Sequence, residues 1–209
     1  MGTETRILGL VLAGGASRRM GGCDKALCRL GGEPLVARVT RRLQPQVDRL
    51  MISGPADYGL GHATLPDRSD GARGPAAALH AAYRWCAEHR GAGIGAVVTV
   101  PVDGPFFPRD LVARLASHGV ATIAETACGP HPTFACWPLD ALAAAAPLLA
   151  APGGLALRRL ADAVGAQAVH FGEEEAFFNI NTPADLARAE TWLATTAEPQ
   201  SRPLTAPDA

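Results

Sequence analysis

A continuous apolar run that passes directly into a glycine-rich loop is the feature of this chain that most restricts its fold. Residues 7–12 form that run, and Ala-Gly-Gly follows at 13–15. A second apolar run, over residues 96–100, stops at Pro-Val-Asp, residues 101–103. Strands that are apolar on both faces are typical of parallel sheets covered by helices on each side. The two runs therefore predict an α/β fold in which a glycine loop and a carboxylate lie at strand ends.

The remaining pattern alternates between helical and extended segments. We expect further strands at 50–53, 120–125, 132–137 and 168–171, and helices over 34–43, 74–88, 109–118, 139–149 and 155–163. A last helix opens at Asn-Thr-Pro-Ala-Asp, residues 181–185, and runs to about residue 194. This alternation predicts a three-layer α/β/α, Rossmann-like fold with a mostly parallel sheet and right-handed crossovers. Ligands of such folds collect at the carboxyl ends of the strands.

Length and composition indicate one globular, cytoplasmic domain. The 209 residues suffice for a single core, so we expect one domain over residues 1–196 and a disordered, proline-containing tail over 197–209. A net charge of −1 argues against binding to nucleic acid or to a membrane surface. Five cysteines without paired spacing argue against a disulfide framework or a four-cysteine zinc site. The apolar run near the N-terminus is too short to span a membrane.

The loop over residues 12–25 carries four glycines and three cations. Glycines allow backbone N–H groups to approach phosphate oxygens, and Arg or Lys neutralises the remaining charge. The loop lacks the GxGxxG pattern, and it is not a GxxxxGK loop followed by Ser or Thr, because Ala26 follows Lys25. It is either a triphosphate-binding loop of another kind or an ordinary strand-to-helix loop with solvated arginines.

Asp103 ends a strand among apolar residues and prolines. An ionised carboxylate in such surroundings needs a partner. A magnesium ion is one candidate, because Mg²⁺ takes one or two carboxylates together with substrate phosphates. The alternative is an N-cap for the helix that follows Pro108. The phosphate loop at the neighbouring strand end favours the metal.

Three motifs together resemble the molybdenum cofactor guanylyltransferase family. They read LAGGASRRMGGCDK at residues 12–25, PVDGPF at 101–106 and NINTPADL at 179–186, and the match covers about residues 7–193. The resemblance implies an enzyme in which the terminal phosphate of molybdopterin, usually already carrying molybdenum, attacks the α-phosphorus of GTP and expels pyrophosphate. The product would be the guanine dinucleotide form of the cofactor, and the metal would be Mg²⁺.

The resemblance also implies roles for individual residues. Three of them would be catalytic, and the others would hold the nucleotide or the metal. The implied set is Arg19 and Lys25 on the phosphates, Asp103 on Mg²⁺, Leu12, Ala13 and Gly14 on the nucleotide, Gly15 in the same loop, and Asp67 on the guanosine.

Several positions depart from the family or allow two interpretations. Ser53 stands where the family often has Asn at the end of the second strand, and we keep it as a candidate nucleotide contact. Ala78 adds a methyl group where the family's GPLxG has glycine. Asn179 and Asn181 either contact substrate or form only the turn and cap of the last helix. His-Pro-Thr at 131–133 matches a family element but equally suits an edge strand with a capping histidine.

Other functions compete with this interpretation. One is a cytidylyltransferase for the same pterin, or another nucleotidyltransferase for sugar phosphates or terpenoids. Relatives that use CTP usually carry LAAG and a different motif at the end of the later strand, so Gly14 and Pro101 favour GTP. The other is a non-catalytic nucleotide-binding protein that hands over the cofactor. The implied partners are GTP and molybdopterin, with molybdenum-insertion proteins and apo-molybdoenzyme chaperones as candidate protein partners.

Overall fold

The structure is a computed structural model that describes residues 5–14, 24–54, 56–65, 74–151 and 154–195. The expected tail, residues 197–209, lies outside these ranges. The strands are β1 (Arg6–Leu12), β2 (Arg29–Leu30), β3 (Glu33–Pro34), β4 (Arg49–Ser53), β5 (Ala63–Leu65), β6 (Ile94–Pro101), β7 (Thr122–Thr126), β8 (Gly129–Pro138) and β9 (Gln167–His170).

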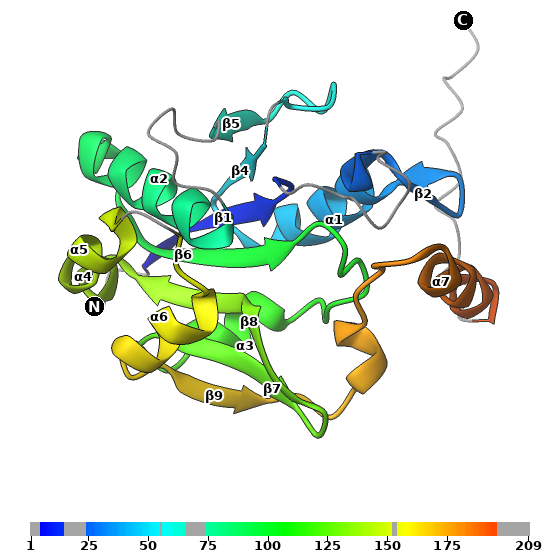
Figure 1. Ribbon diagram of the computed structural model, residues 1–209. Helices are drawn as coiled ribbons and strands as arrows, with labels where there is room; N and C mark the ends of the chain where they lie inside the picture. Colours follow the sequence, from blue (N-terminus) through cyan, green and yellow to red (C-terminus); the bar gives the residue numbers. More distant parts are fainter. Residues whose placement is uncertain (1–4, 15–23, 55, 66–73, 152–153, 196–209) are drawn as a thin grey trace, which may run out of the picture.

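The main sheet has seven strands in the order β5-β4-β1-β6-β8-β7-β9 (Figure 1). β1 pairs in parallel with β4 and β6, and β4 pairs in parallel with β5. β8 is antiparallel to its neighbours β6 and β7, while β9 is parallel to β7. Within this sheet only β8 runs against the other strands, so the predicted mostly parallel sheet is confirmed. β2 and β3 form a separate short hairpin.

Helices cover both faces of the sheet (Figure 1). The α-helices are α1 (Leu35–Leu43), α2 (Pro75–Glu88), α3 (Leu111–Ala116), α4 (Leu139–Ala144), α5 (Ala146–Ala150), α6 (Leu157–Ala163) and α7 (Pro183–Thr195). The short 3₁₀ helices are η2 (Lys25–Leu27), η3 (Gln44–Gln46), η4 (Arg90–Ala92) and η5 (Glu174–Phe177).

Alternation along β1 divides the core into two parts. Val11 points to the face covered by α1 and α3, whereas Leu8 and Leu10 point to the face covered by α2, α4, α5 and α6. Both clusters consist of fully or almost fully buried side chains. On the α1 side, Gly9 allows close approach, since a Cβ there would lie 3.0 Å from the Leu43 side chain. The predicted three-layer α/β/α architecture is therefore confirmed.

One predicted helix is wrong in its extent. We expected a continuous helix over residues 139–149, but the structure has α4 and α5, which meet at Ala145. Pro147 explains the break, because proline lacks the backbone N–H and its ring clashes with the carbonyl four residues earlier. β5 and the β2–β3 hairpin were not predicted, since two or three residues are too few to show an alternating pattern.

The helices within the described ranges are all too short or too polar to cross a membrane.

Candidate active site

The site begins where β1 and β6 end side by side. Leu12 pairs with Pro101, and the Val102 N–H donates to the Leu12 carbonyl at 3.1 Å. On the other side of β1, the Ala13 N–H donates to the Ser53 carbonyl at 2.9 Å. The backbone after β1 is thereby fixed between its two neighbouring strands, next to the segment that carries Asp103.

A cleft of about 290 Å³ opens at these strand ends. It brings together seven of the residues that the sequence singled out, along with four that it did not assign. The seven are Leu12, Ala13, Gly14, Lys25, Asp103, Asn179 and Asn181, and the other four are Pro75, Pro101, Val102 and Thr133.

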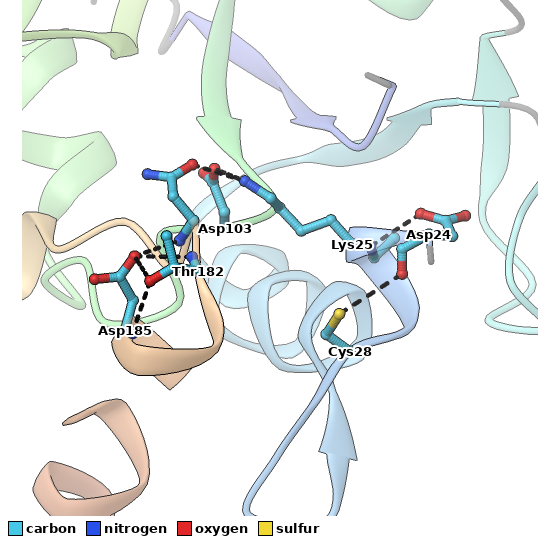
Figure 2. A network of polar contacts seen from close by, with 8 residues as sticks. Asp24, Lys25, Cys28, Asp103, Thr182 and Asp185 are labelled. Carbon is cyan, nitrogen blue, oxygen red and sulfur yellow. Dashed lines mark hydrogen bonds and ion pairs between the residues drawn. The ribbon is translucent and has the colours of Figure 1, made fainter. Parts of the chain in front are cut away.

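Lys25 lies at the centre of the polar contacts in this cleft. Its Nζ donates to Asp103 Oδ2 at 2.8 Å and to Asn181 Oδ1 at 2.8 Å (Figure 2). The Lys25 and Asp103 side chains are only 18% and 19% exposed. Lys25 opens η2, whose N-terminus is capped by Asp24 through a 3.0 Å bond from the Ala26 N–H. The ion pair supplies the partner that a carboxylate needs at an apolar strand end.

Asp103 does not cap the helix that follows it. The N-cap position of α3 is Asp110, and the Asp103 carboxylate faces Lys25 instead. The capping interpretation of Asp103 is therefore wrong, and its side chain belongs to the cleft.

The segment before α7 is hydrogen-bonded to the backbone of Asp103. The Ile180 N–H donates to the Asp103 carbonyl at 2.8 Å. At the start of α7, Thr182 Oγ1 accepts from the Asp185 N–H at 3.1 Å, and Asp185 Oδ2 accepts from the Thr182 N–H at 2.8 Å. This reciprocal pair is a capping box. Thr182 is thus the capping side chain, while the Asn181 side chain points to Lys25.

The pKa of Asp185 is lowered. The main cause is the hydrogen bond from the Thr182 hydroxyl, at 2.9 Å, and the Asn181 and Thr182 N–H groups and the Arg188 charge act in the same direction. Hydrogen bonds and positive charge favour the ionised carboxyl. Asp185 is therefore an anion at neutral pH and accepts without competition from its own proton.

Thr133 reaches the cleft because β8 bulges. Ile123 of β7 pairs with Ala135, but the next residue, Ala124, pairs with His131. The extra residues of β8 at 132–134 leave the regular ladder, and Thr133 lines the cleft. Pro132, which has no N–H to donate, is the only signal of this irregularity in the sequence.

His131 has a structural role. Its ring stacks on Phe177 with centroids 5.0 Å apart, and its Nε2 lies 2.9 Å from Thr126 Oγ1. Burial lowers the pKa of His131, which favours the neutral ring. Of the motif at 131–133, only Thr133 lines the cleft.

Asn179 carries a buried acceptor. Its Oδ1 has no hydrogen-bond partner among the described residues, although Asn179 lines the cleft. Burying a polar atom without a partner costs about 1–3 kcal/mol, so such atoms usually meet a ligand or water. Asn179 therefore carries an unsatisfied buried acceptor beside the cleft that it lines.

Of the other four predicted site residues, the structure describes only Ser53. Ser53 is 2% exposed and supports Ala13 through its backbone carbonyl, beside the cleft. Its contact with the nucleotide stays a prediction. Gly15, Arg19 and Asp67 lie outside the residues that the structure describes.

The oxygen ligands among the described residues of the cleft are few. Among the described residues there is no group of three or more His, Cys, Asp or Glu side chains that could hold a metal. Asp103 is the carboxylate among the described residues that line the cleft, and a single carboxylate with phosphate oxygens is an ordinary ligand set for Mg²⁺. The site therefore fits Mg²⁺ that arrives with a phosphate-bearing substrate.

Comparison with known proteins agrees with this geometry. Residues 9–169 match the MobA-like NTP transferase domain. A molybdenum cofactor guanylyltransferase of Cereibacter sphaeroides is 45% identical over 194 residues, which cover 90% of this chain and 97% of that protein.

Two solved structures share the fold. Molybdopterin-guanine dinucleotide biosynthesis protein A of Archaeoglobus fulgidus superimposes with a TM-score of 0.69 at 23% identity, covering 90% of this chain and 99% of the other. The 4-diphosphocytidyl-2C-methyl-D-erythritol synthase of Anaerococcus prevotii gives a TM-score of 0.69 at 13% identity, covering 91% and 96%.

Proposed function

The chain belongs to the MobA-like NTP transferase family, and from that premise we propose that it transfers GMP from GTP to the terminal phosphate of molybdopterin in the cytoplasm. The products are the guanine dinucleotide form of the cofactor and pyrophosphate. Similarity to the Cereibacter sphaeroides guanylyltransferase over 90% of this chain supports this substrate pair. The proposal takes Mg²⁺ as the metal. The proposed protein partners are those that insert molybdenum and the chaperones that carry the cofactor to apo-molybdoenzymes.

The observation that carries the proposal is the contact between Lys25 and Asp103 in a cleft at the strand ends. A cation for phosphate and a carboxylate for a metal lie 2.8 Å apart, beside the glycine-containing turn after β1. Phosphoryl and nucleotidyl transfer depend mainly on positioning and charge neutralisation, so this pair supplies what the reaction requires. A nucleophilic side chain is not needed, because the attacking phosphate is itself anionic at neutral pH.

The residues of the cleft have different roles in the reaction. Leu12, Ala13 and Gly14 bind the nucleotide, and Lys25 holds its phosphates near the α-phosphorus. An oxygen of the acceptor phosphate forms a bond to the α-phosphorus, while the bond from that phosphorus to the β-phosphate oxygen breaks and pyrophosphate leaves. Asp103 would hold Mg²⁺, which would supply additional positive charge at the phosphates. Lys25 stabilises the charge that develops on the leaving group.

The acceptor lies against Thr133 and Asn179 in the same cleft. The side chains of Thr133 and Asn179, which both line the cleft, supply polar contacts to the acceptor. The place of both residues in the cleft lining, beside Lys25 and Asp103, supports this assignment.

A nucleotide panel tests the proposal. The protein is incubated with molybdopterin, Mg²⁺ and GTP, CTP or ATP, and pyrophosphate release is followed together with the mass of the dinucleotide product. We expect GTP to be preferred and Lys25→Ala to reduce the rate with every nucleotide. Equal use of GTP and CTP would remove the guanine assignment. Absence of pyrophosphate with all three would favour a non-catalytic handover protein.

A further inference from the structure

We infer that Asp185, which lies outside the cleft lining, is a positioning residue for Lys25 and acts through Asn181. The inference rests on the proposed function, because it takes Lys25 to hold the phosphates of the nucleotide. It assigns a role in the reaction to a residue that sequence analysis placed only in the first turn of a helix.

Two hydrogen bonds connect Asp185 to Lys25, one to the backbone and one to the side chain of Asn181 (Figure 2). Asp185 Oδ2 accepts from the Asn181 N–H at 3.0 Å, and the Asn181 side chain accepts from Lys25 Nζ at 2.8 Å. Lys25 Nζ also donates to Asp103 Oδ2 at 2.8 Å. The carboxylate at the start of α7 thus fixes the backbone of the residue whose amide oxygen holds the cation.

The bond to Asn181 goes beyond what helix capping requires. Thr182 and Asp185 already close the capping box with one bond in each direction, and the Thr182 hydroxyl donates to the same Oδ2 at 2.9 Å. The additional bond from the Asn181 N–H satisfies a residue that precedes the helix. It sets the position from which the Asn181 side chain reaches Lys25.

Lys25 needs such an anchor. Its side chain is a flexible four-carbon chain that loses considerable rotamer entropy when it is held in one conformation. Asp103 is one of its two acceptors, but Asp103 is also the carboxylate that fits the metal. When another cation competes for Asp103, the neutral oxygen of Asn181 continues to hold Lys25. Positioning of Asn181 then decides where the ammonium points.

The first test is the affinity for GTP in the presence of Mg²⁺ and without the acceptor, measured by calorimetry. Asp185→Asn keeps the shape of the side chain but removes the charge that attracts three donors from two residues. We expect GTP to bind about 10-fold more weakly, the scale expected when a charge-assisted hydrogen bond is weakened. The matched control is Asp140→Asn, since Asp140 accepts the Ala141 N–H at 2.7 Å in the first turn of α4, away from the cleft. The control variant should bind GTP like the wild type.

The second test asks whether Asp185 acts through Lys25. In a Lys25→Ala background, Asp185→Asn should cause no further loss of GTP affinity, because the group that it positions is gone. The same 10-fold loss in both backgrounds would overturn the inference. Wild-type affinity of Asp185→Asn would overturn it as well.

A third pair of variants separates positioning from simple folding. Thr182→Ser keeps the hydroxyl that donates to Asp185 and should bind GTP normally, whereas Thr182→Ala should weaken binding in the same direction as Asp185→Asn. A loss for Thr182→Ser equal to that for Thr182→Ala would contradict the role of the hydroxyl. If Lys25→Ala itself binds GTP normally, the proposed function of the cleft is refuted. A normal Asp185→Asn beside a defective Lys25→Ala refutes only the positioning role.

Discussion

Replacing Gly104 by alanine should lower both stability and turnover. Gly104 follows Asp103 in the chain and packs against the buried ring of Phe134. A Cβ at Gly104 would lie 2.5 Å from Phe134 Cζ and 3.1 Å from Asn179 Oδ1. Ordinary contacts begin near 3.4 Å, so about 1 Å of movement is required. Phe134 is fully buried and cannot move freely, since its ring packs against Phe107 and Phe177 with centroids 6.1 Å and 5.1 Å away.

The segment that carries Asp103 therefore has to move instead. Overpacking of this kind typically costs about 1–3 kcal/mol of unfolding free energy. A displacement of about 1 Å at a catalytic group can lower the rate by about 10²-fold. Urea unfolding and steady-state kcat with GTP and molybdopterin measure the two effects. We expect Gly104→Ala to lose both stability and kcat.

Two further variants check the cause. Gly172→Ala is the control, because a Cβ there meets no heavy atom within 4 Å and the backbone is not left-handed. It should leave stability and kcat unchanged. Phe134→Leu removes the ring atom that clashes, so combining it with Gly104→Ala should cost less stability than the sum of the two single changes. Wild-type behaviour of Gly104→Ala, or strict additivity with Phe134→Leu, would refute the reasoning.

Other perturbations test the cleft separately. Asp103→Asn should lower kcat by about 10²-fold or more while the protein remains folded, and near-wild-type turnover at limiting Mg²⁺ would contradict this. Lys25→Ala should raise KM for GTP and lower kcat together, with only partial rescue by Lys25→Arg, because the guanidinium differs in shape. Gly14→Ala should lose more kcat/KM with GTP than with CTP, since the added methyl narrows the space for a purine, and equal losses would argue against this. The pKa of Asp185 is lowered in the folded protein, so its ionised carboxylate stabilises the fold at pH values above 3.8, its ordinary pKa. This stabilisation is lost as the pH falls through the lower pKa of the folded state. Acid unfolding should therefore be less steep in Asp185→Asn, and identical curves would contradict the sign.

The strand ends could be predicted from sequence because apolar periodicity and chain direction determine them. The two apolar runs became β1 and β6, and the parallel pairing of Leu12 with Pro101 brought the loop and Asp103 to one edge. Three-layer packing followed from the same alternation of strands and helices. Short elements escaped prediction, as the three residues of β5 illustrate.

Contacts between distant side chains were beyond what the sequence reveals. Lys25 and Asp103 were both expected in the site, but their direct 2.8 Å contact depends on the register of β1 with β6 and on the turn of η2. Thr133 enters the cleft through a bulge that Pro132 hints at but does not define. The sequence placed Asp185 only in the first turn of the last helix, and the three-dimensional placement of Asn181 connects it to Lys25.

The contact between Lys25 and Asn181 also has a consequence for biosynthesis. The two residues are 156 positions apart. A ribosome that adds about 5–20 residues per second needs roughly 8–30 s to pass from one to the other. During that interval most of the sheet has been synthesised, yet the neutral acceptor for the ammonium is still missing. A nascent chain interrupted in that interval would lack this acceptor, so translation must pass residue 181 before the complete phosphate site can form.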